Sequence, residues 1–315
     1  MFATSRDQLR QLGYMSAAVQ QQPHLQPLLR KMLNCMQVIR SCVNDELRDP
    51  SKDISNVISL CRKKVDALMI EFQSVMDQDC PSAEYFEEKR KESIENDLKA
   101  VACKDPMKEK MLRDAILYLR QLEETREFHA SLLSAQEDLT TYPISTYAYG
   151  TTSYLTMKSL LQLGPISQVL DNIYEDPHPD ACTVFGSSTG SLVVYTALSQ
   201  GIPVRGIEIL PFLVDQSKKM TTRCKIDAPI TFLLDDMLNV SLDNTKLLIL
   251  ASQCWDKDLW AKLLSKLQMI NHSMVILDYT DRLSSETWCS HIATGFGAVS
   301  WNDHQEFNVY SIQQE

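Results

Sequence analysis

The stretch CTVFGSSTG, residues 182–190, runs from apolar residues into a turn of small residues, and a helix-like segment follows it. Short runs rich in Val, Ile and Leu are typical of strands that are buried on both faces of a sheet. Glycine and serine let the backbone approach a ligand closely, and the following helix offers free N–H groups at its N-terminus. The stretch therefore predicts the first strand–helix crossover of an α/β sheet, with a ligand at the carboxyl end of the strand.

The same pattern repeats toward the C-terminus. Four further apolar runs follow, namely VRGIEI, ITFLLDD, KLLILAS and SMVILDY. Helical segments lie between the runs at Gly190–Gln200, Pro211–Arg223 and Lys257–Gln268. Alternation of this kind predicts a parallel sheet with right-handed crossovers.

The end of the chain differs from the rest of this half. HIATGFGAVSW and EFNVYSIQ are separated only by Asn302–Gln305, which predicts an antiparallel hairpin. Five parallel strands closed by an antiparallel pair form the Rossmann-like sheet of class I methyltransferases. The hairpin distinguishes that sheet from an ordinary dinucleotide-binding one.

The first 140 residues have the 3–4 residue periodicity of helices. We expect helices at Leu25–Leu47, from Ser51 onward, at Ser82–Ala102 and from Asp105, where an N-cap residue precedes a proline. Helices without strands predict a bundle. The predicted organisation is thus an all-α helical bundle over residues 1–140 and a Rossmann-like α/β domain over residues 141–315.

Composition narrows the classes of function. A net charge of −10 without a basic stripe argues against nucleic acid as the partner. No apolar run reaches the roughly 18–20 residues of a membrane span, and the first residues lack the apolar core of a secretory signal. Nine cysteines without paired spacing indicate reduced thiols and a cytoplasmic protein. No cluster has the spacing of metal ligands, so we expect no metal.

The ends of the first three strands carry the candidate cofactor-binding residues. The turn after the first strand comprises Gly186, Ser187, Ser188, Thr189 and Gly190. Glu208 at the second strand end is placed to accept the hydroxyl protons of a ribose. At the third strand end, an acidic and an apolar side chain are expected to contact an adenine; these are Asp235, Asp236 and Met237.

The end of the fourth strand faces the reacting group in such a fold. The candidates there are Ser252, Gln253 and Trp255, which we expect to position an acceptor. Group transfer from a reactive cofactor needs alignment of donor and acceptor more than it needs a catalytic triad. The sequence therefore leaves the acceptor open between a small molecule and a protein.

In order and spacing, FGSSTG, GIEI, FLLDDML and LLILASQCWD resemble the motifs of class I S-adenosylmethionine-dependent methyltransferases. The pattern is most similar to non-SET histone-lysine methyltransferases of the disruptor-of-telomeric-silencing type. Tyr149-Gly150-Thr151-Thr152 resembles the entry loop that folds over the cofactor in that family. GIEI followed by Pro211 resembles its ribose-binding strand, and Lys257–Trp260 its acceptor-side loop.

The resemblance covers a little over half of the chain. It implies S-adenosyl-L-methionine as cofactor, Tyr149 and Gly150 as further cofactor contacts, and Tyr149 as a catalytic residue as well. It also implies a methyltransferase whose protein acceptor is a lysine.

The chain departs from the family pattern at several positions. Val184 replaces an acidic residue, Ser188 a glycine and Thr151 a glutamate, and Ser252-Gln253 replaces an asparagine-rich loop. These departures favour one alternative, a catalytically inactive methyltransferase-like interaction protein. A looser resemblance to nicotianamine synthases, which also join a helical bundle to such a sheet, implies a second alternative, an aminocarboxypropyl transferase.

The helical half has two interpretations. As a cap over the site, it would place Tyr142, Tyr147 and Tyr149 over the strand ends. As a docking module for a protein acceptor, or as a homodimer interface, it would leave an apolar stripe exposed.

Overall fold

The computed structural model describes residues 63–64, 67, 83–101, 105–300 and 302–312. The chain divides into two compact units, Met1–Glu88 and Lys89–Glu315. The helix predicted at Leu25–Leu47 lies outside the described residues, as does the one predicted from Ser51 apart from three helical positions, 63, 64 and 67. The bundle as a whole and its predicted role in dimerisation therefore stay predictions.

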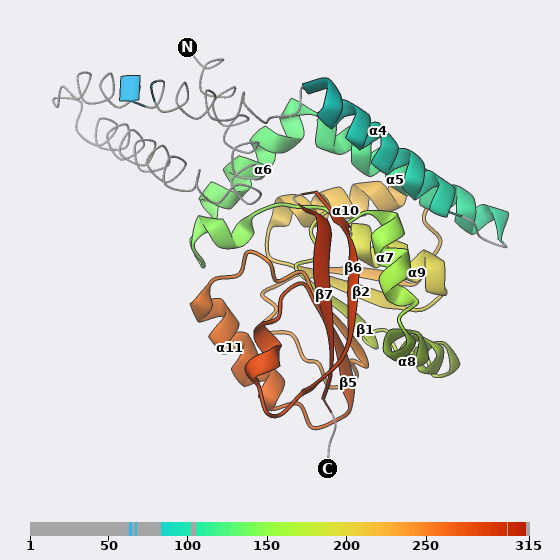
Figure 1. Cartoon of the computed structure of the whole chain (residues 1–315), viewed down its shortest axis with the longest axis vertical. Coiled ribbons are helices and arrows are strands. Elements are labelled where there is room, and N and C mark those ends of the chain that lie inside the picture. The colour runs from blue at the N-terminus through green and yellow to red at the C-terminus, as the bar shows by residue number, and fades with distance from the viewer. Residues whose placement is uncertain (1–62, 65–66, 68–82, 102–104, 301, 313–315) are drawn as a thin grey trace. The chain divides into compact units, whose positions relative to one another are not determined.

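The second unit is built on a seven-stranded sheet in the order β3-β2-β1-β4-β5-β7-β6 (Figure 1). The five parallel strands are β1 (Cys182–Phe185), β2 (Val204–Glu208), β3 (Ile230–Leu234), β4 (Leu247–Leu250) and β5 (Met274–Asp278). β7 (Asn302–Ile312) runs antiparallel to β5 and to β6 (Ser290–Val299). The predicted fold class, a Rossmann-like methyltransferase sheet with a terminal antiparallel hairpin, is confirmed.

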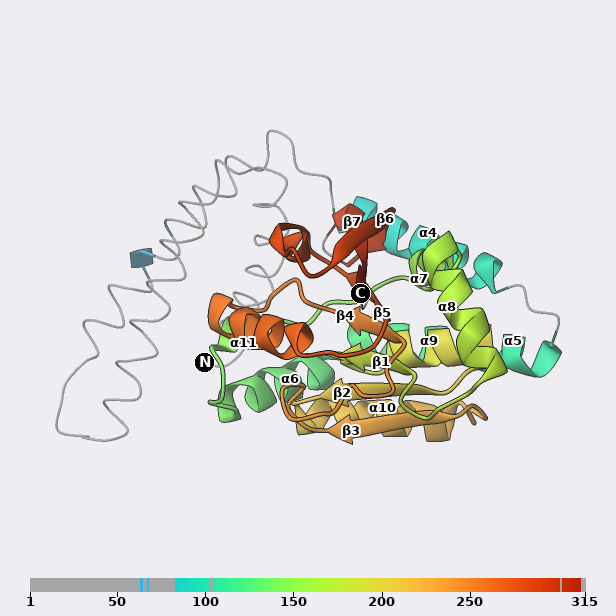
Figure 2. The same cartoon turned by 90° about the horizontal axis from the view of Figure 1, so that it is seen from below.

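Helices cover both faces of this sheet, and the alternation of side chains along each strand serves both layers. The helices between the strands are α9 (Ser191–Gln200), α10 (Pro211–Arg223) and α11 (Lys257–Gln268). α7 (Tyr154–Leu161) and α8 (Gly164–Glu175) precede the first strand. α11 lies on the opposite face of the sheet from α8 and α9 (Figure 2).

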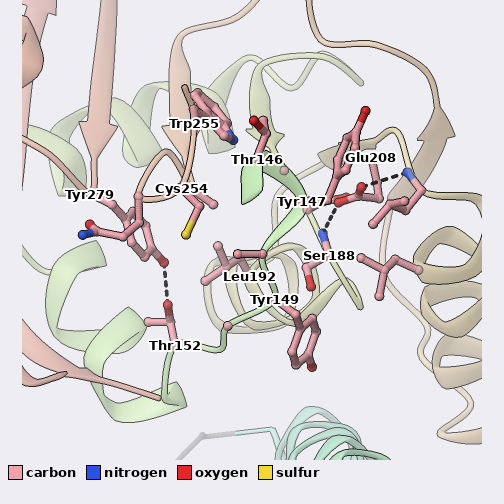
Figure 3. Close-up of a pocket in the computed structure, with 18 of the residues that line it drawn as sticks. Thr146, Tyr147, Tyr149, Thr152, Ser188, Leu192, Glu208, Cys254, Trp255 and Tyr279 are labelled. Carbon is pink, nitrogen blue, oxygen red and sulfur yellow. Dashed lines mark hydrogen bonds between the residues drawn. The ribbon is translucent and has the colours of Figure 1, made fainter. Parts of the chain in front are cut away.

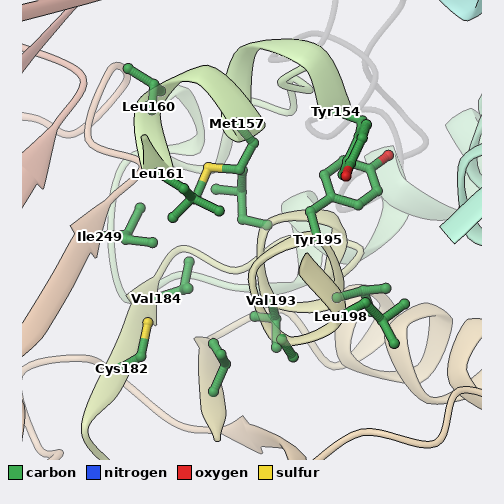
Figure 4. Packing of buried hydrophobic residues seen from close by; sticks show 14 of the residues in the cluster. Tyr154, Met157, Leu160, Leu161, Cys182, Val184, Val193, Tyr195, Leu198 and Ile249 are labelled. Atoms are coloured by element: carbon green, nitrogen blue, oxygen red, sulfur yellow. The ribbon is translucent and has the colours of Figure 1, made fainter. Parts of the chain in front are cut away.

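Buried hydrophobic side chains pack together beneath α7 and α9 (Figure 4). Val184 of β1 and Ile249 of β4 point toward these helices, whereas Phe185 and Leu250, the next residues along each strand, point toward α11. Each of these four side chains is completely buried. Burial of each such aliphatic or aromatic side chain stabilises the fold by about 1.5–3 kcal/mol. The two layers thus hold the strands in place, and this fixes which strand ends converge on the site.

Three helices precede the sheet: α4 (Ala83–Ala100), α5 (Pro106–Glu124) and α6 (Arg126–Asp138). Asp105 caps α5 by accepting hydrogen bonds from the backbone N–H groups of Met107 and Lys108, as its position before a proline predicts. α5 packs on α9 and α6 packs on α10. α5 and α6 therefore belong to the compact unit of the sheet, whereas α4 crosses the boundary between the two units at Glu88 and Lys89. The predicted domain division stays a prediction.

The hairpin differs from the prediction in its connection. Residues 302–305 belong to β7, and pairing extends as far as Val299 with Asn302. The polar composition that indicated a loop is compatible with pairing because one face of an antiparallel pair can meet water. None of the helices that the structure describes has the length and apolarity of a membrane span.

Candidate functional site

A cavity of about 130 Å³ lies at the carboxyl ends of β1, β2 and β4 (Figure 3). Its outer wall is the segment Thr146–Thr152, here called the strap. Eight of the predicted site residues line the cavity: Tyr149, Gly150, Gly186, Ser187, Ser188, Glu208, Gln253 and Trp255. The predicted convergence of the loop, the second strand end and the fourth strand end is therefore present.

The turn after β1 is held by backbone hydrogen bonds. The N–H groups of Gly186 and Ser187 each donate to the carbonyl of Ile207 at 3.0 Å. Gly186, Ser188 and Gly190 all have positive φ, at 70°, 53° and 83°. A Cβ on Gly190 would lie 2.7 Å from the ring of Phe232, so this position requires glycine. Ser188 adopts a left-handed conformation although it is not a glycine.

Glu208 is buried at the end of β2 and binds the turn. Its Oε2 accepts the N–H of Ser188 at 2.9 Å, and its Oε1 accepts the N–H groups of Ile209 at 2.9 Å and Leu210 at 3.0 Å. Burial raises the pKa of this carboxyl, and the three N–H donors oppose that rise. A carboxylate has about four acceptor positions, so one remains for a ligand hydroxyl. The sequence predicted contact with both hydroxyls of a ribose.

The strap is fixed from both sides. The phenol of Tyr149 donates to Glu123 of α5 at 2.9 Å. On the other side, Thr152 forms an isolated antiparallel bridge with Val299, and its hydroxyl lies 2.6 Å from that of Tyr279. Tyr147 and Tyr149 line the cavity, which is the arrangement expected of a cap over the strand ends.

The third strand end does not reach the cavity. Asp235 is exposed, and Asp236 accepts the phenol of Tyr142 and the N–H of Leu238. Met237 packs with the apolar cluster beneath α11. Thr189 and Gly190 are likewise absent from the cavity lining. The predicted cofactor contacts of these residues stay predictions.

The fourth strand end is divided between the cavity and the interior. Gln253 and Trp255 line the cavity, and the Oε1 atom of Gln253 is buried without a hydrogen-bond partner. Ser252 is completely buried and donates to Asp278 of β5 instead. The structure therefore turns Ser252 away from the place where it was expected to contact an acceptor, because Asp278 offers its hydroxyl an acceptor inside the sheet.

Asp278 is a buried carboxyl beside the site with a raised pKa. It also accepts the hydroxyl of Thr280 at 2.9 Å. Burial raises its pKa to about 6, and the hydroxyl donors act in the opposite direction. Asp278 does not line the cavity, so its effect on the site passes through Ser252.

Several cavity residues were missed in the sequence. Cys254 is exposed and lies between Gln253 and Trp255, while Tyr279, Thr152 and Leu192 come from three other parts of the chain. Thr152 stands in the segment Tyr149–Thr152 that resembles an entry loop, but it was not named as a site residue. No local motif marks Tyr279 and Leu192, which only the topology brings to the cavity. Cys254 was within reach of prediction, because it stands inside the fourth strand end that the motif identifies. Among the described residues, no group of His, Cys, Asp and Glu has the arrangement of a metal site.

No protein-family model matches the chain, and no curated protein matches it in sequence. Solved structures with a similar arrangement include magnesium protoporphyrin IX methyltransferase from Synechocystis PCC 6803 with bound S-adenosylmethionine, at 13% identity and a TM-score of 0.36 over 54% of this chain and 88% of that one. A putative RNA methyltransferase from Pyrococcus horikoshii gives 15% identity and a TM-score of 0.40, over 60% and 99% respectively.

An RNA methyltransferase from Salinibacter ruber in complex with S-adenosyl-L-homocysteine gives 19% identity and a TM-score of 0.35, over 47% of this chain and 92% of that one. Likenesses of this size carry no argument about activity. The function is therefore argued from the site itself.

Proposed function

We propose that this protein is an S-adenosylmethionine-dependent methyltransferase. The observation that carries the proposal is Glu208, which is buried at the end of β2 and hydrogen-bonded to the positive-φ turn that precedes α9. A carboxylate at this strand end, beside a helix N-terminus, suits a ligand that has both a ribose and a carboxylate.

The hydrogen-bond acceptors in the cavity suit this cofactor, but the size of the cavity sets one steric condition. Glu208 keeps one acceptor position for a hydroxyl, and the buried Oε1 of Gln253 lacks a partner. The cavity of about 130 Å³ is smaller than the roughly 300 Å³ at which typical ligand pockets begin. We therefore expect the cavity to widen when the whole cofactor binds.

The bound cofactor would supply an electrophilic methyl group, and the chain's own residues would provide alignment. Gln253 can accept a hydrogen bond from an N–H or O–H of the acceptor, and Trp255 offers an aromatic wall beside it. Apart from phenols and a thiol, Glu208 has the one ionisable side chain among the described residues that line the cavity. Its carboxylate is already hydrogen-bonded to three N–H groups. The acceptor therefore loses its proton to solvent.

The proposed acceptor is a small molecule or a protein side chain, lysine among the latter. The net charge of −10 remains the argument against nucleic acid. A catalytically inactive interaction protein and an aminocarboxypropyl transferase of the nicotianamine synthase type remain the alternatives.

Two labelled cofactors test the reaction. The protein is incubated with cell extract and S-adenosylmethionine labelled either in the methyl group or in the carboxyl carbon, and small molecules, protein and RNA are then separated. The proposal predicts transfer of the methyl label alone, to small molecules or protein. Transfer of the carboxyl label would indicate the aminocarboxypropyl reaction, and methyl label in RNA would contradict the proposed acceptor. Absence of transfer of either label would favour the inactive alternative.

A further inference from the structure

A line of charged side chains runs from α4 through α5 to the strap. The phenol of Tyr149 donates to Oε1 of Glu123 at 2.9 Å, and Oε2 of Glu123 lies 3.5 Å from Nη1 of Arg120. Nη2 of Arg120 lies 3.3 Å from Oδ2 of Asp97, whose Oδ1 accepts the N–H of Leu155 at 2.9 Å. The line thus begins at the cavity wall and ends in the first turn of α7.

These groups are largely removed from water. The side chains of Asp97, Arg120 and Glu123 are 1%, 17% and 18% exposed. Burial raises the pKa of Glu123, while Arg120 and the phenol of Tyr149 oppose that rise. Burial and Glu123 both raise the pKa of Tyr149, so the phenol keeps the proton that it donates. Removing one member of such a network leaves a buried charge without its partner, which is costly.

The two ends of the line bracket the second half of the strap. Tyr149 precedes Thr152, and Leu155 follows it. Between these ends, Thr152 pairs with Val299, and the N–H of Thr151 donates to the hydroxyl of Ser300 at 3.0 Å. The strap is therefore held by α5 on one side and by the hairpin on the other.

We propose that Glu123 is a positioning residue that holds Tyr149, and with it the strap, over the cavity. Arg120 and Asp97 orient Glu123 from behind. The part of this proposal that concerns cofactor affinity rests on the proposed methyltransferase function. Helix α5 thereby contributes to the site through a carboxylate that no motif of the sheet contains.

Two readouts test this role in the full-length protein. The first is hydrogen exchange of the backbone amides of residues 144–153 without ligand. Glu123→Ala is expected to increase exchange there by about tenfold or more, because the tether of Tyr149 is lost, and to leave β5 unchanged. Glu123→Gln keeps an acceptor for the phenol and is expected to restore most of the protection. Glu109→Ala on the same helix, which loses a half-buried pair with Arg113 outside the line of charged side chains, is the matched control and should leave strap exchange unchanged.

The second readout is the Kd for S-adenosylhomocysteine. Glu123→Ala is expected to weaken binding by about tenfold. In the double variant, the further change Tyr149→Phe is expected to weaken binding by less than about another twofold, because the effects of substitutions at contacting residues are not additive. If Glu123→Ala does not fold, Tyr149→Phe alone provides both readouts. Unchanged strap exchange in the folded variants would overturn the proposal. If the unaltered protein does not bind the ligand, the methyltransferase function fails, and strap exchange alone decides the role of Glu123.

Discussion

Ser188 shows how a residue other than glycine is accommodated in a left-handed turn position. Its φ of 53° is a conformation that L residues adopt at a cost, and its N–H is fixed by Glu208. Its buried hydroxyl has no hydrogen-bond partner. This residue therefore preserves the shape of the turn and its carboxylate contact, while it adds strain.

Ser188→Gly should relieve this strain. We expect the free energy of unfolding to rise by about 0.5–1 kcal/mol, since the gain from removing the Cβ is partly offset by a more flexible unfolded chain. Urea denaturation measures the change. A loss of stability in this variant would show that the hydroxyl makes a stabilising contact and would contradict this account of the turn.

Gly190→Ala should have the opposite effect. The new Cβ would meet the ring of Phe232 at 2.7 Å in a backbone with φ of 83°. We expect destabilisation by about 1–3 kcal/mol from overpacking and backbone strain. Gly164→Ala is the matched control, because a Cβ there has no neighbour within 4 Å. Equal stability of the two variants would count against the close contact with Phe232.

At the scale of elements, helix α11 is tied to the strap through its cap. Asp256 accepts the N–H groups of Asp258 and Leu259, and it also accepts the hydroxyl of Thr146 at 2.8 Å. The N–H of Leu259, first among these donors, lowers the pKa of Asp256. The helix that follows the fourth strand end is therefore anchored at its N-terminus, close to the cavity.

Asp256→Ala removes both the cap and the tether. We expect a loss of about 1 kcal/mol in the free energy of unfolding, the usual effect of losing an N-cap. Asp256→Asn retains a capping oxygen and should lose less than half of this. Because the folded-state pKa is lowered, the advantage of the carboxylate is present at neutral pH and disappears as the pH falls through that pKa. If the stability advantage of the carboxylate over Asp256→Asn persists in strong acid, the lowered pKa of Asp256 is contradicted.

Elements are also the scale at which sequence and structure agree most closely. The helices at Pro211–Arg223 and Lys257–Gln268 begin and end as predicted, because proline and an aspartate cap mark their starts. The insertion of β7 between β5 and β6 was beyond prediction, since no local pattern encodes which strand lies beside which.

In the candidate site, too, local motifs could be predicted from the sequence, whereas contacts between distant segments could not. The loop after β1 and Glu208 belong to local motifs and were found, whereas Thr152 and Tyr279 meet only through the fold. Ser252 was expected at the cavity because sequence position alone cannot tell that Asp278 takes its hydroxyl. Glu123 was not singled out, because its partner Tyr149 lies on another element.

At the scale of the whole molecule, Asp278 links stability to pH. Its folded-state pKa is raised from 3.8 to about 6, with burial as the main cause. A carboxyl of raised pKa binds its proton more tightly in the folded state than in the unfolded one. Its contribution to stability is therefore fully present below pH 3.8 and is lost as the pH rises through about 6.

Asp278→Asn should remove this dependence. The amide can still accept one hydroxyl proton and can donate to the other hydroxyl, so Ser252 and Thr280 keep partners. We expect the variant to gain about 1–3 kcal/mol relative to the unaltered protein between pH 4 and pH 7. Chemical denaturation at several pH values measures this difference, in which the effects of other carboxyls cancel. Parallel curves across that range would show that Asp278 is not perturbed.

The central claim, that the cavity beside Glu208 binds S-adenosylmethionine, is tested most directly by calorimetric titration of the full chain with S-adenosylmethionine and S-adenosylhomocysteine. The account predicts one-to-one binding with a Kd of about 1–100 μM, weakened by about tenfold or more in folded Glu208→Ala. Glu175→Ala, an exposed carboxyl on α8, is the control and should bind as the unaltered protein does. Absence of binding at about millimolar ligand, or equal binding by Glu208→Ala, would contradict the claim.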